Sequence, residues 1–246
     1  VDGLVMGGGV GVSLHGSHRV AGERMVFAMP ETGIGLFPDV GATYLLSRLP
    51  GAIGLYLGLT GTRVEARDAL WSGIATHFVP SGKFPALAAA LAGADDLDRC
   101  LAAFAETPAT GPLAQRRPTI DRLFASPTLG DLMTGLANDR DDFAAVTRAE
   151  LLTKSPTSLA ITFRQLTEGR TLAFEEAIRR EFRIVCRIPL GRDFFEGIRA
   201  IVIDKDKAPR WQPARLAEVS PEAVERYFAP LAAELDLADL TSTAAG

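Results

Sequence analysis

The sequence predicts an α/β protein built from two unlike parts. Residues 1–80 are rich in glycine and contain short apolar runs separated by turns, a pattern typical of short strands that alternate with short helices. From residue 81 to residue 246, apolar side chains recur at helical spacing almost throughout. We therefore expect a mixed core at 1–80 and, at 81–246, a mostly helical C-terminal region that packs on this core.

The core part is expected to alternate short strands with short helices. The strands are expected at residues 1–6, 19–21 and 25–29, with residues 22–24 as the turn between the last two. The helices are expected at residues 10–18, 40–49, 53–59 and 65–72. Gly61 and Gly73 close the last two helices, because glycine readily adopts the left-handed conformation that ends many helices.

The C-terminal part is expected to be a succession of helices. Ser155-Pro156 and Ser220-Pro221 are each typical of a helix start, with serine as the N-cap and proline in the first helical position. The other helices are expected at residues 86–91, 97–105, 119–124, 128–137, 139–154, 171–188 and 192–203. Residues 107–118 and 209–213 are the expected loops, and the small polar tail at 241–246 is expected to fray.

The composition argues against several classes of protein. With 47% hydrophobic and 23% charged residues, the 246-residue chain resembles an ordinary globular protein. Its formal net charge of −4 leaves no dominant basic surface, so we expect no nucleic-acid partner. Since no apolar run reaches the roughly 18 residues of a membrane span, we also expect no membrane partner.

The cysteines and the N-terminus suggest a reducing compartment. The chain does not begin with a basic region followed by an apolar one, so no signal peptide is expected and the cytoplasm is the expected location. Cys100 and Cys186 are too few for a disulfide framework. We expect them to be free buried thiols, with a single disulfide between them left open.

The glycine run Gly7-Gly8-Gly9 follows an expected strand and precedes an expected helix. A backbone without Cβ atoms can approach a ligand closely, and N–H groups at a helix start favour negative charge. Such donors suit the oxyanion that forms at a thioester carbonyl. Two other interpretations exist. The glycines could only allow close packing of helix and strand, or Gly9 and Gly11 could begin a dinucleotide-binding fingerprint.

The dinucleotide interpretation fits the residues poorly. Glu31 lies 20 residues beyond Gly11, the spacing expected of the acidic residue in that fingerprint. However, Leu14 occupies the position of the third glycine, and Glu31 lies in a turn rather than at a strand end. His15 and His18 are three residues apart with no third ligand nearby, so no metal site is expected there.

Two carboxylates lie in a stiff apolar segment. Glu31 follows Pro30 and is surrounded in sequence by apolar side chains, so its carboxylate should be partly desolvated, with a raised pKa. The alternative is an ordinary turn glutamate. Asp39 directly precedes an expected helix and would be a good N-cap. Their separation allows both side chains to face one pocket.

Taken together, these motifs resemble the crotonase (enoyl-CoA hydratase/isomerase) superfamily, and most closely its 3-hydroxyisobutyryl-CoA hydrolase branch. The resemblance runs through most of the chain and is weakest at 82–152. Its motifs are the segments at residues 6–11, 27–41, 59–61, 73–77, 155–159, 194–200 and 203–206. The fold implied is the C-terminal part of a crotonase-like ββα spiral core followed by a mostly helical region.

The resemblance implies roles for three residues. The Gly8 N–H would contribute one donor of the oxyanion hole, and Glu31 would be the catalytic carboxylate that attacks the carbonyl or activates water. Asp39 would orient the substrate hydroxyl or the water. No metal or redox cofactor is implied, since the coenzyme A is part of the acyl-CoA substrate. A homo-oligomer is left open.

Two departures from the family pattern refine this expectation. Hydratases of the superfamily carry a second catalytic glutamate where this chain has Gly11, and Phe37-Pro38-Asp39 replaces their usual Pro-Gly turn. Both favour a 3-hydroxyisobutyryl-CoA hydrolase of valine breakdown. An isomerase or hydratase of the same superfamily is one alternative, and a non-catalytic partner module is another.

A further departure from the family pattern concerns the start of the chain. The family has several strands before the glycine run, and these carry the second oxyanion donor and much of the CoA-adenine contact. Here the run starts at Gly7, so we expect the sequence to lack the N-terminal part of the family's domain.

Overall fold

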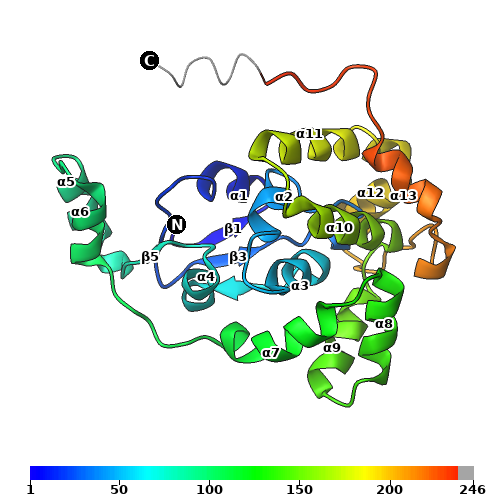
Figure 1. The fold of residues 1–246 in the computed structure, drawn as a ribbon, viewed down its shortest axis with the longest axis horizontal. Coiled ribbons are helices and arrows are strands. Elements are labelled where there is room, and N and C mark those ends of the chain that lie inside the picture. Colours follow the sequence, from blue (N-terminus) through cyan, green and yellow to red (C-terminus); the bar gives the residue numbers. More distant parts are fainter. Residues whose placement is uncertain (238–246) are drawn as a thin grey trace.

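The structure is a computed structural model that describes residues 1–237. The tail at 241–246, expected to fray, lies outside the described residues. Short strands occupy the middle of the molecule, and helices surround them (Figure 1). Among the described residues, no helix has the length and apolar character needed to cross a bilayer.

The strands form two small sheets. In the first, β1 (Leu4–Met6) pairs in parallel with β3 (Val26–Ala28), which pairs antiparallel with β4 (Val64–Glu65). In the second, β2 (Val20–Ala21) pairs in parallel with β5 (His77–Phe78). The turn expected at 22–24 is present, with Met25 N donating to Gly22 O at 3.1 Å, and it connects the two sheets.

The strands expected near 1–6, 19–21 and 25–29 are confirmed, whereas β4 and β5 were not expected. Each of these two strands is two residues long and therefore too short to show the alternation that marks a strand in a sequence. They form because a partner strand, distant in sequence, offers hydrogen bonds.

The core part also contains four α-helices. They are α1 (Gly8–Ser13), α2 (Ala42–Leu46), α3 (Ile53–Thr60) and α4 (Ala66–Ser72). As expected, α3 and α4 end at glycines in the left-handed conformation, Gly61 with φ 69° and Gly73 with φ 83°. The single-turn 3-10 helix η1 (Glu31–Ile34) follows Pro30.

Helices α1 and α2 differ from the expected 10–18 and 40–49. Helix α1 starts earlier and ends at Ser13, so that His15 and His18 lie beyond it. Helix α2 is shorter at both ends. Its later start has a clear cause, since Val40 and Gly41 both adopt left-handed backbone conformations before it. A left-handed residue cannot be part of a right-handed helix.

The C-terminal part is helical, as expected. Its helices are α5 (Phe84–Leu91), α6 (Leu97–Phe104), α7 (Pro112–Phe124), α8 (Leu129–Asn138), α9 (Asp142–Leu151), α10 (Pro156–Gly169), α11 (Phe174–Val185), α12 (Asp193–Ile198) and α13 (Pro221–Phe228). A π-helical turn, η4 (Arg199–Ile203), continues α12, and the 3-10 turns are η2 (Ser81–Lys83), η3 (Ile188–Leu190) and η5 (Leu216–Glu218). Figure 1 shows α5 and α6 at one end of the molecule and α8, α9 and α13 toward the other.

Both expected serine caps are confirmed. The Ser155 Oγ accepts a hydrogen bond from Ser158 N at 3.1 Å, and the Ser220 Oγ accepts one from Ala223 N at 3.1 Å. The signal was local in both cases, because cap and capped N–H lie three residues apart.

The loop expected at 107–118 is wrong in its second half, because α7 begins at Pro112. The start of α7 is held by a distant side chain. Asp68 of α4 accepts hydrogen bonds from Leu113 N at 3.1 Å and Ala114 N at 3.3 Å. A cap that comes from 45 residues away leaves no local signal in the sequence.

The apolar core joins the two parts of the chain. Its largest cluster contains Phe27 and Leu57 from the first part together with Ile120 and Leu166 from the second. Helix α10 lies directly on α3, where Gly58 leaves room for Leu166. The helices that follow residue 80 therefore share one apolar core with the elements of the first part.

Both cysteines are free, as expected. The expectation that both are buried is wrong, because Cys100 is half-buried and Cys186 is exposed. Among the described residues, no group of three histidine, cysteine or acidic side chains could hold a metal ion. His18 is exposed and contacts Asp98, whereas His77 contacts Thr76.

The Asp68 cap yields a stability prediction. Replacing Asp68 by alanine leaves two N–H groups of α7, one buried and one partly buried, without their acceptor, so the free energy of unfolding should fall by about 1–3 kcal/mol. Urea denaturation measures this change. Glu65→Ala, which removes an exposed carboxylate three residues earlier, is the control and should change the free energy by less than about 0.5 kcal/mol. Equal effects of both variants would contradict the assignment.

Candidate active site

Glu31 is the buried carboxylate of the candidate site. It is the first residue of η1, and only 4% of its surface is exposed. Its Oε2 atom is buried and has no hydrogen-bond partner among the described residues. A buried polar atom without a partner is costly, and in native proteins it commonly marks a functional group.

Burial also changes the chemistry of this carboxyl group. Desolvation, together with a smaller effect of the nearby charge of Asp39, raises the pKa of Glu31 to about 8. A main-chain hydrogen bond acts in the opposite direction. The expected rise in the pKa is confirmed, and Glu31 is mostly protonated at neutral pH.

The glycine run lies against Glu31. A Cβ atom on Gly7 would lie 3.6 Å from the Glu31 Oε1 atom. Gly7 has φ 49°, a left-handed conformation that glycine adopts without strain, and it turns the chain from β1 into α1. Gly8 is the exposed first residue of α1, where N–H groups have no partner within the helix. The start of the glycine run and the Glu31 carboxylate thus lie side by side.

Asp39 lies close enough to Glu31 for its negative charge to raise the pKa of Glu31. It is half-buried, and this burial raises its own pKa as well. The expectation that Asp39 caps the next helix is wrong, because α2 begins after Gly41 and has no cap from a local side chain. The Asp39 side chain is therefore available to the site.

The cap of α2 comes from Glu181 of α11 instead. Its carboxylate accepts hydrogen bonds from Gly41 N at 2.7 Å and Thr43 N at 2.8 Å. Glu181 is buried, and this burial raises its pKa to about 7, although the two N–H donors act against the rise. Sequence reasoning missed this residue. A signal existed, because Glu181 lies between Ala177 and Ile184 on the buried stripe of an amphipathic helix.

Gly11 is the position where hydratases of the superfamily carry a second glutamate. Here a Cβ atom on Gly11 would lie 2.9 Å from the Cβ of Val40, closer than real Cβ atoms come to their neighbours. Val40, which follows Asp39, thus occupies the space beside α1. Any side chain at position 11 would require the Val40 backbone to move.

Helix α12 and Ser155 contact the segment that carries Glu31 directly. A Cβ on Gly35 would lie 2.2 Å from the main chain of Asp193, and one on Gly197 would lie 2.3 Å from the main chain of Ile34. Helix α12 and η1 are therefore in backbone contact. Ser155 also links η1 to α12, because its N–H donates to Thr32 O at 3.1 Å and its Oγ donates to Asp193 at 2.6 Å.

A cavity of about 550 Å³ lies beside Glu31. The ends of the C-terminal helices supply one wall of it, and the Trp211 indole is held there by a hydrogen bond to Thr153 O at 3.0 Å. Its volume falls within the range typical of small-molecule sites. The lining residues are Pro30, Glu31, Gly33, Ile34, Leu152, Thr153, Lys154, Ile201, Lys207, Pro209 and Trp211.

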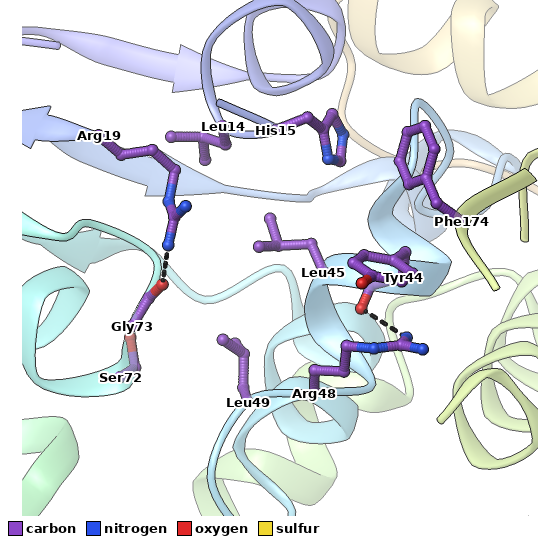
Figure 2. A pocket seen from close by; sticks show the side chains of 10 residues that line it. All are labelled: Leu14, His15, Arg19, Tyr44, Leu45, Arg48, Leu49, Ser72, Gly73 and Phe174. Atoms are coloured by element: carbon purple, nitrogen blue, oxygen red, sulfur yellow. Dashed lines mark hydrogen bonds between the residues drawn. The ribbon is translucent and has the colours of Figure 1, made fainter. Parts of the chain in front are cut away.

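A second cavity, of about 450 Å³, includes none of the three predicted site residues among its lining (Figure 2). Its basic side chains are engaged with the main chain: Arg19 donates to Gly73 O, and Arg48 donates to Tyr44 O. His15 lies at its edge, and the His15 Nε2 is 2.7 Å from Val40 O. This cavity thus adjoins the segment that follows Asp39.

The family of this chain follows from its similarity to known proteins. The family model described as enoyl-CoA hydratase/isomerase matches residues 1–228. This chain belongs to the enoyl-CoA hydratase/isomerase family. The crotonase-like α/β fold expected from the motifs is thereby confirmed.

Curated relatives show which members of the enoyl-CoA hydratase/isomerase family this chain is similar to. The chain is 43% identical to 3-hydroxyisobutyryl-CoA hydrolase 1 of Arabidopsis thaliana, with 96% of this chain and 66% of that protein covered. It is 44% identical to the mitochondrial 3-hydroxyisobutyryl-CoA hydrolase of Danio rerio, with 94% and 63% covered. The chain thus spans slightly less than two thirds of the length of these relatives.

Solved structures of the same family agree. A carnitinyl-CoA dehydratase from Mycobacterium thermoresistibile has a TM-score of 0.89 at 40% identity, covering 95% of this chain and 68% of that one. An enoyl-CoA hydratase from Rhodobacter sphaeroides 2.4.1 has a TM-score of 0.84 at 42% identity, covering 93% and 66%. The roles that the resemblance implied for Gly8, Glu31 and Asp39 stay predictions.

The raised pKa of Glu31 predicts how stability depends on pH. Between its ordinary value and about 8, the unfolded chain ionises this carboxyl while the folded protein keeps its proton. The free energy of unfolding should therefore fall as pH rises, by about 1.4 kcal/mol per pH unit for this group, and level off above about pH 8.

Urea denaturation of the wild type and of Glu31→Gln between pH 5 and pH 9 measures this slope. The variant should lose the Glu31 part of the slope, so the difference between the two proteins should grow with pH. Glu181, which shifts in the same direction, is present in both proteins and cancels in the comparison. Parallel curves would contradict the buried state of Glu31.

Proposed function

We propose that this protein hydrolyses the thioester bond of a short 3-hydroxyacyl-CoA, and that its substrate is 3-hydroxyisobutyryl-CoA. The observation that carries the proposal is the buried Glu31 carboxylate, with one oxygen unpaired, beside Gly7 at the start of the glycine run. The curated relatives at 43–44% identity support this substrate by their names. The cavity beside Glu31 is large enough for a short branched acyl group.

The reaction requires a new bond to the thioester carbonyl carbon and loss of the C–S bond. Ionised Glu31 either removes a proton from the water that attacks this carbon, or attacks it itself. The carbonyl oxygen then becomes an oxyanion, to which the Gly8 N–H donates. When the C–S bond breaks, the CoA sulfur leaves as a thiolate and takes up a proton. Where Glu31 itself attacks, the loss of the thiolate leaves a mixed anhydride on Glu31, which water then cleaves to release the acid and restore the Glu31 carboxylate. One well-placed oxyanion donor is typically worth about 10²–10³-fold in rate.

Asp39 would distinguish this substrate from a simple acyl-CoA. Its carboxylate is half-buried, lies near Glu31 and has no side-chain donor among the described residues. A carboxylate in this state can accept a hydrogen bond from the 3-hydroxyl of the substrate or from the attacking water. Either contact would align the acyl group with Glu31.

A second candidate function is isomerisation of an enoyl-CoA. One observation favours it: a carboxyl group with a pKa near 8 is well suited to move a proton at neutral pH. Hydration is disfavoured, since Val40 fills the space beside Gly11 where a second carboxylate would stand. Thiol release from 3-hydroxyisobutyryl-CoA distinguishes hydrolysis from isomerisation and from a non-catalytic role, because neither of the others frees CoA.

The proposal also covers the partners and the location of this protein. We expect an acyl-CoA as the small-molecule partner and no metal or redox cofactor, and a homo-oligomer is left open. The relatives from Danio rerio and Gallus gallus are named as mitochondrial. For this chain, the cytoplasmic location stays a prediction from the sequence.

Substitution of Glu31 tests the mechanism. Glu31→Gln should lower kcat for CoA release at least about 10³-fold, because the amide neither attacks a carbonyl nor accepts a proton. In the wild type, kcat/KM should rise with pH up to about 8, since only ionised Glu31 reacts. Spectrophotometric detection of the freed thiol measures both. Undiminished release by the variant would refute the role of Glu31.

The hydroxyl contact makes a separate prediction. Asp39→Asn should lower kcat/KM for 3-hydroxyisobutyryl-CoA by about 10–100-fold, and that for isobutyryl-CoA, which lacks the hydroxyl, by much less. If Asp39 orients water instead, both substrates should lose equally. Asp98→Asn, which changes an exposed aspartate paired with His18, is the matched control and should leave both values unchanged.

A further inference from the structure

We propose that Glu181 and Gln165, two buried side chains of the C-terminal helices, are positioning residues that set the direction of the Asp39 carboxylate. The inference rests on the proposed function, because it concerns how Asp39 meets its substrate. It assigns part of the site to helices α10 and α11, whose residues lie more than 120 positions from Asp39.

The main chain on both sides of Asp39 is bonded to distant side chains. Gln165 Nε2 donates to Pro38 O at 2.7 Å, directly before Asp39. Glu181 accepts from Gly41 N at 2.7 Å and from Thr43 N at 2.8 Å, shortly after it. The backbone of Asp39 is thus held between two fixed points.

The two helices are also tied to each other through this segment. Gln165 Nε2 makes a second hydrogen bond, at 2.6 Å, to the Oγ1 of Thr43, the residue whose N–H Glu181 accepts. Gln165 and Glu181 are 0% and 5% exposed, so water cannot readily replace either contact. Hydrogen bonds in such surroundings hold geometry more strictly than exposed ones.

The segment needs this support, because its backbone is strained. Val40 has φ 54°, a conformation that is rare and costly for a β-branched residue. Such a residue persists only where its surroundings determine it, and it often lies beside a functional group. His15, 2.7 Å from Val40 O, adds a third contact from the other side.

In this arrangement the Asp39 side chain does not cap the helix that follows it. An aspartate before a helix ordinarily turns its carboxylate onto the first N–H groups. Here Glu181 already occupies those N–H groups, and its negative charge repels the Asp39 carboxylate from them. Glu181 therefore does the capping that Asp39 would otherwise do, and the Asp39 side chain is left for substrate.

A double-mutant cycle on the full chain tests whether Glu181 acts through Asp39. Glu181→Gln should lower kcat/KM for 3-hydroxyisobutyryl-CoA about tenfold, mainly through KM, and that for isobutyryl-CoA by less than about twofold. In the Asp39→Asn background, Glu181→Gln should have less than about a twofold further effect. Gln165→Met, which removes both donors at nearly the same volume, should follow the same pattern and provides a second probe if Glu181→Gln folds poorly.

The control and the contrary outcomes are distinct. Glu176→Gln, on the exposed side of the same helix, should leave kcat/KM unchanged for both substrates. If Glu181→Gln lowers kcat/KM equally for the two substrates, its role is merely structural. The same holds if it lowers kcat/KM by its full factor again in the Asp39→Asn background. Either result would overturn the inference while the proposed function stands. If the wild type releases no CoA from either substrate, the proposed function fails, and the inference fails with it.

Discussion

The burial of the Glu31 carboxylate is the constraint on which the structure around it depends. A carboxyl group that is 4% exposed, with one oxygen unpaired, costs free energy that the surrounding packing must offset. The protein holds η1 in place through contacts with Ser155 and with the main chain of α12. The same desolvation that raises its pKa to about 8 makes its ionised form a strong base or nucleophile.

The C-terminal helices are therefore part of the site rather than an appendage to it. Backbone contact between α12 and η1 is possible only because Gly35 and Gly197 lack side chains. Ser155 joins η1 to α12 through Thr32 and Asp193, and Glu181 joins the Asp39 segment to α11. The segments that carry Glu31 and Asp39 thus each have their own supporting contacts from residues beyond 150.

The sequence predicts what depends on neighbouring residues and misses what depends on distant ones. The caps at Ser155 and Ser220 and the helix ends at Gly61 and Gly73 were predictable, because cause and effect lie within a few residues. The motifs also drew attention to Glu31 and Asp39, which the structure places near each other, with Gly7 beside Glu31; the roles of Gly8, Glu31 and Asp39 stay predictions. The strands β4 and β5, the start of α7 and the cap of α2 were not predicted, since each depends on a partner far along the chain.

Asp39 illustrates why the missed contact matters for chemistry. Local rules assign its carboxylate to the helix that follows, and in that role the helix would set the direction of the carboxylate. The long-range cap from Glu181 overrides the local rule, and the left-handed Val40 that results lies 2.9 Å from where a Gly11 side chain would begin. One backbone geometry thus frees the Asp39 carboxylate and at the same time excludes a second one from α1. On the proposed function, the choice of hydrolysis over hydration follows from how α11 holds residues 40–43.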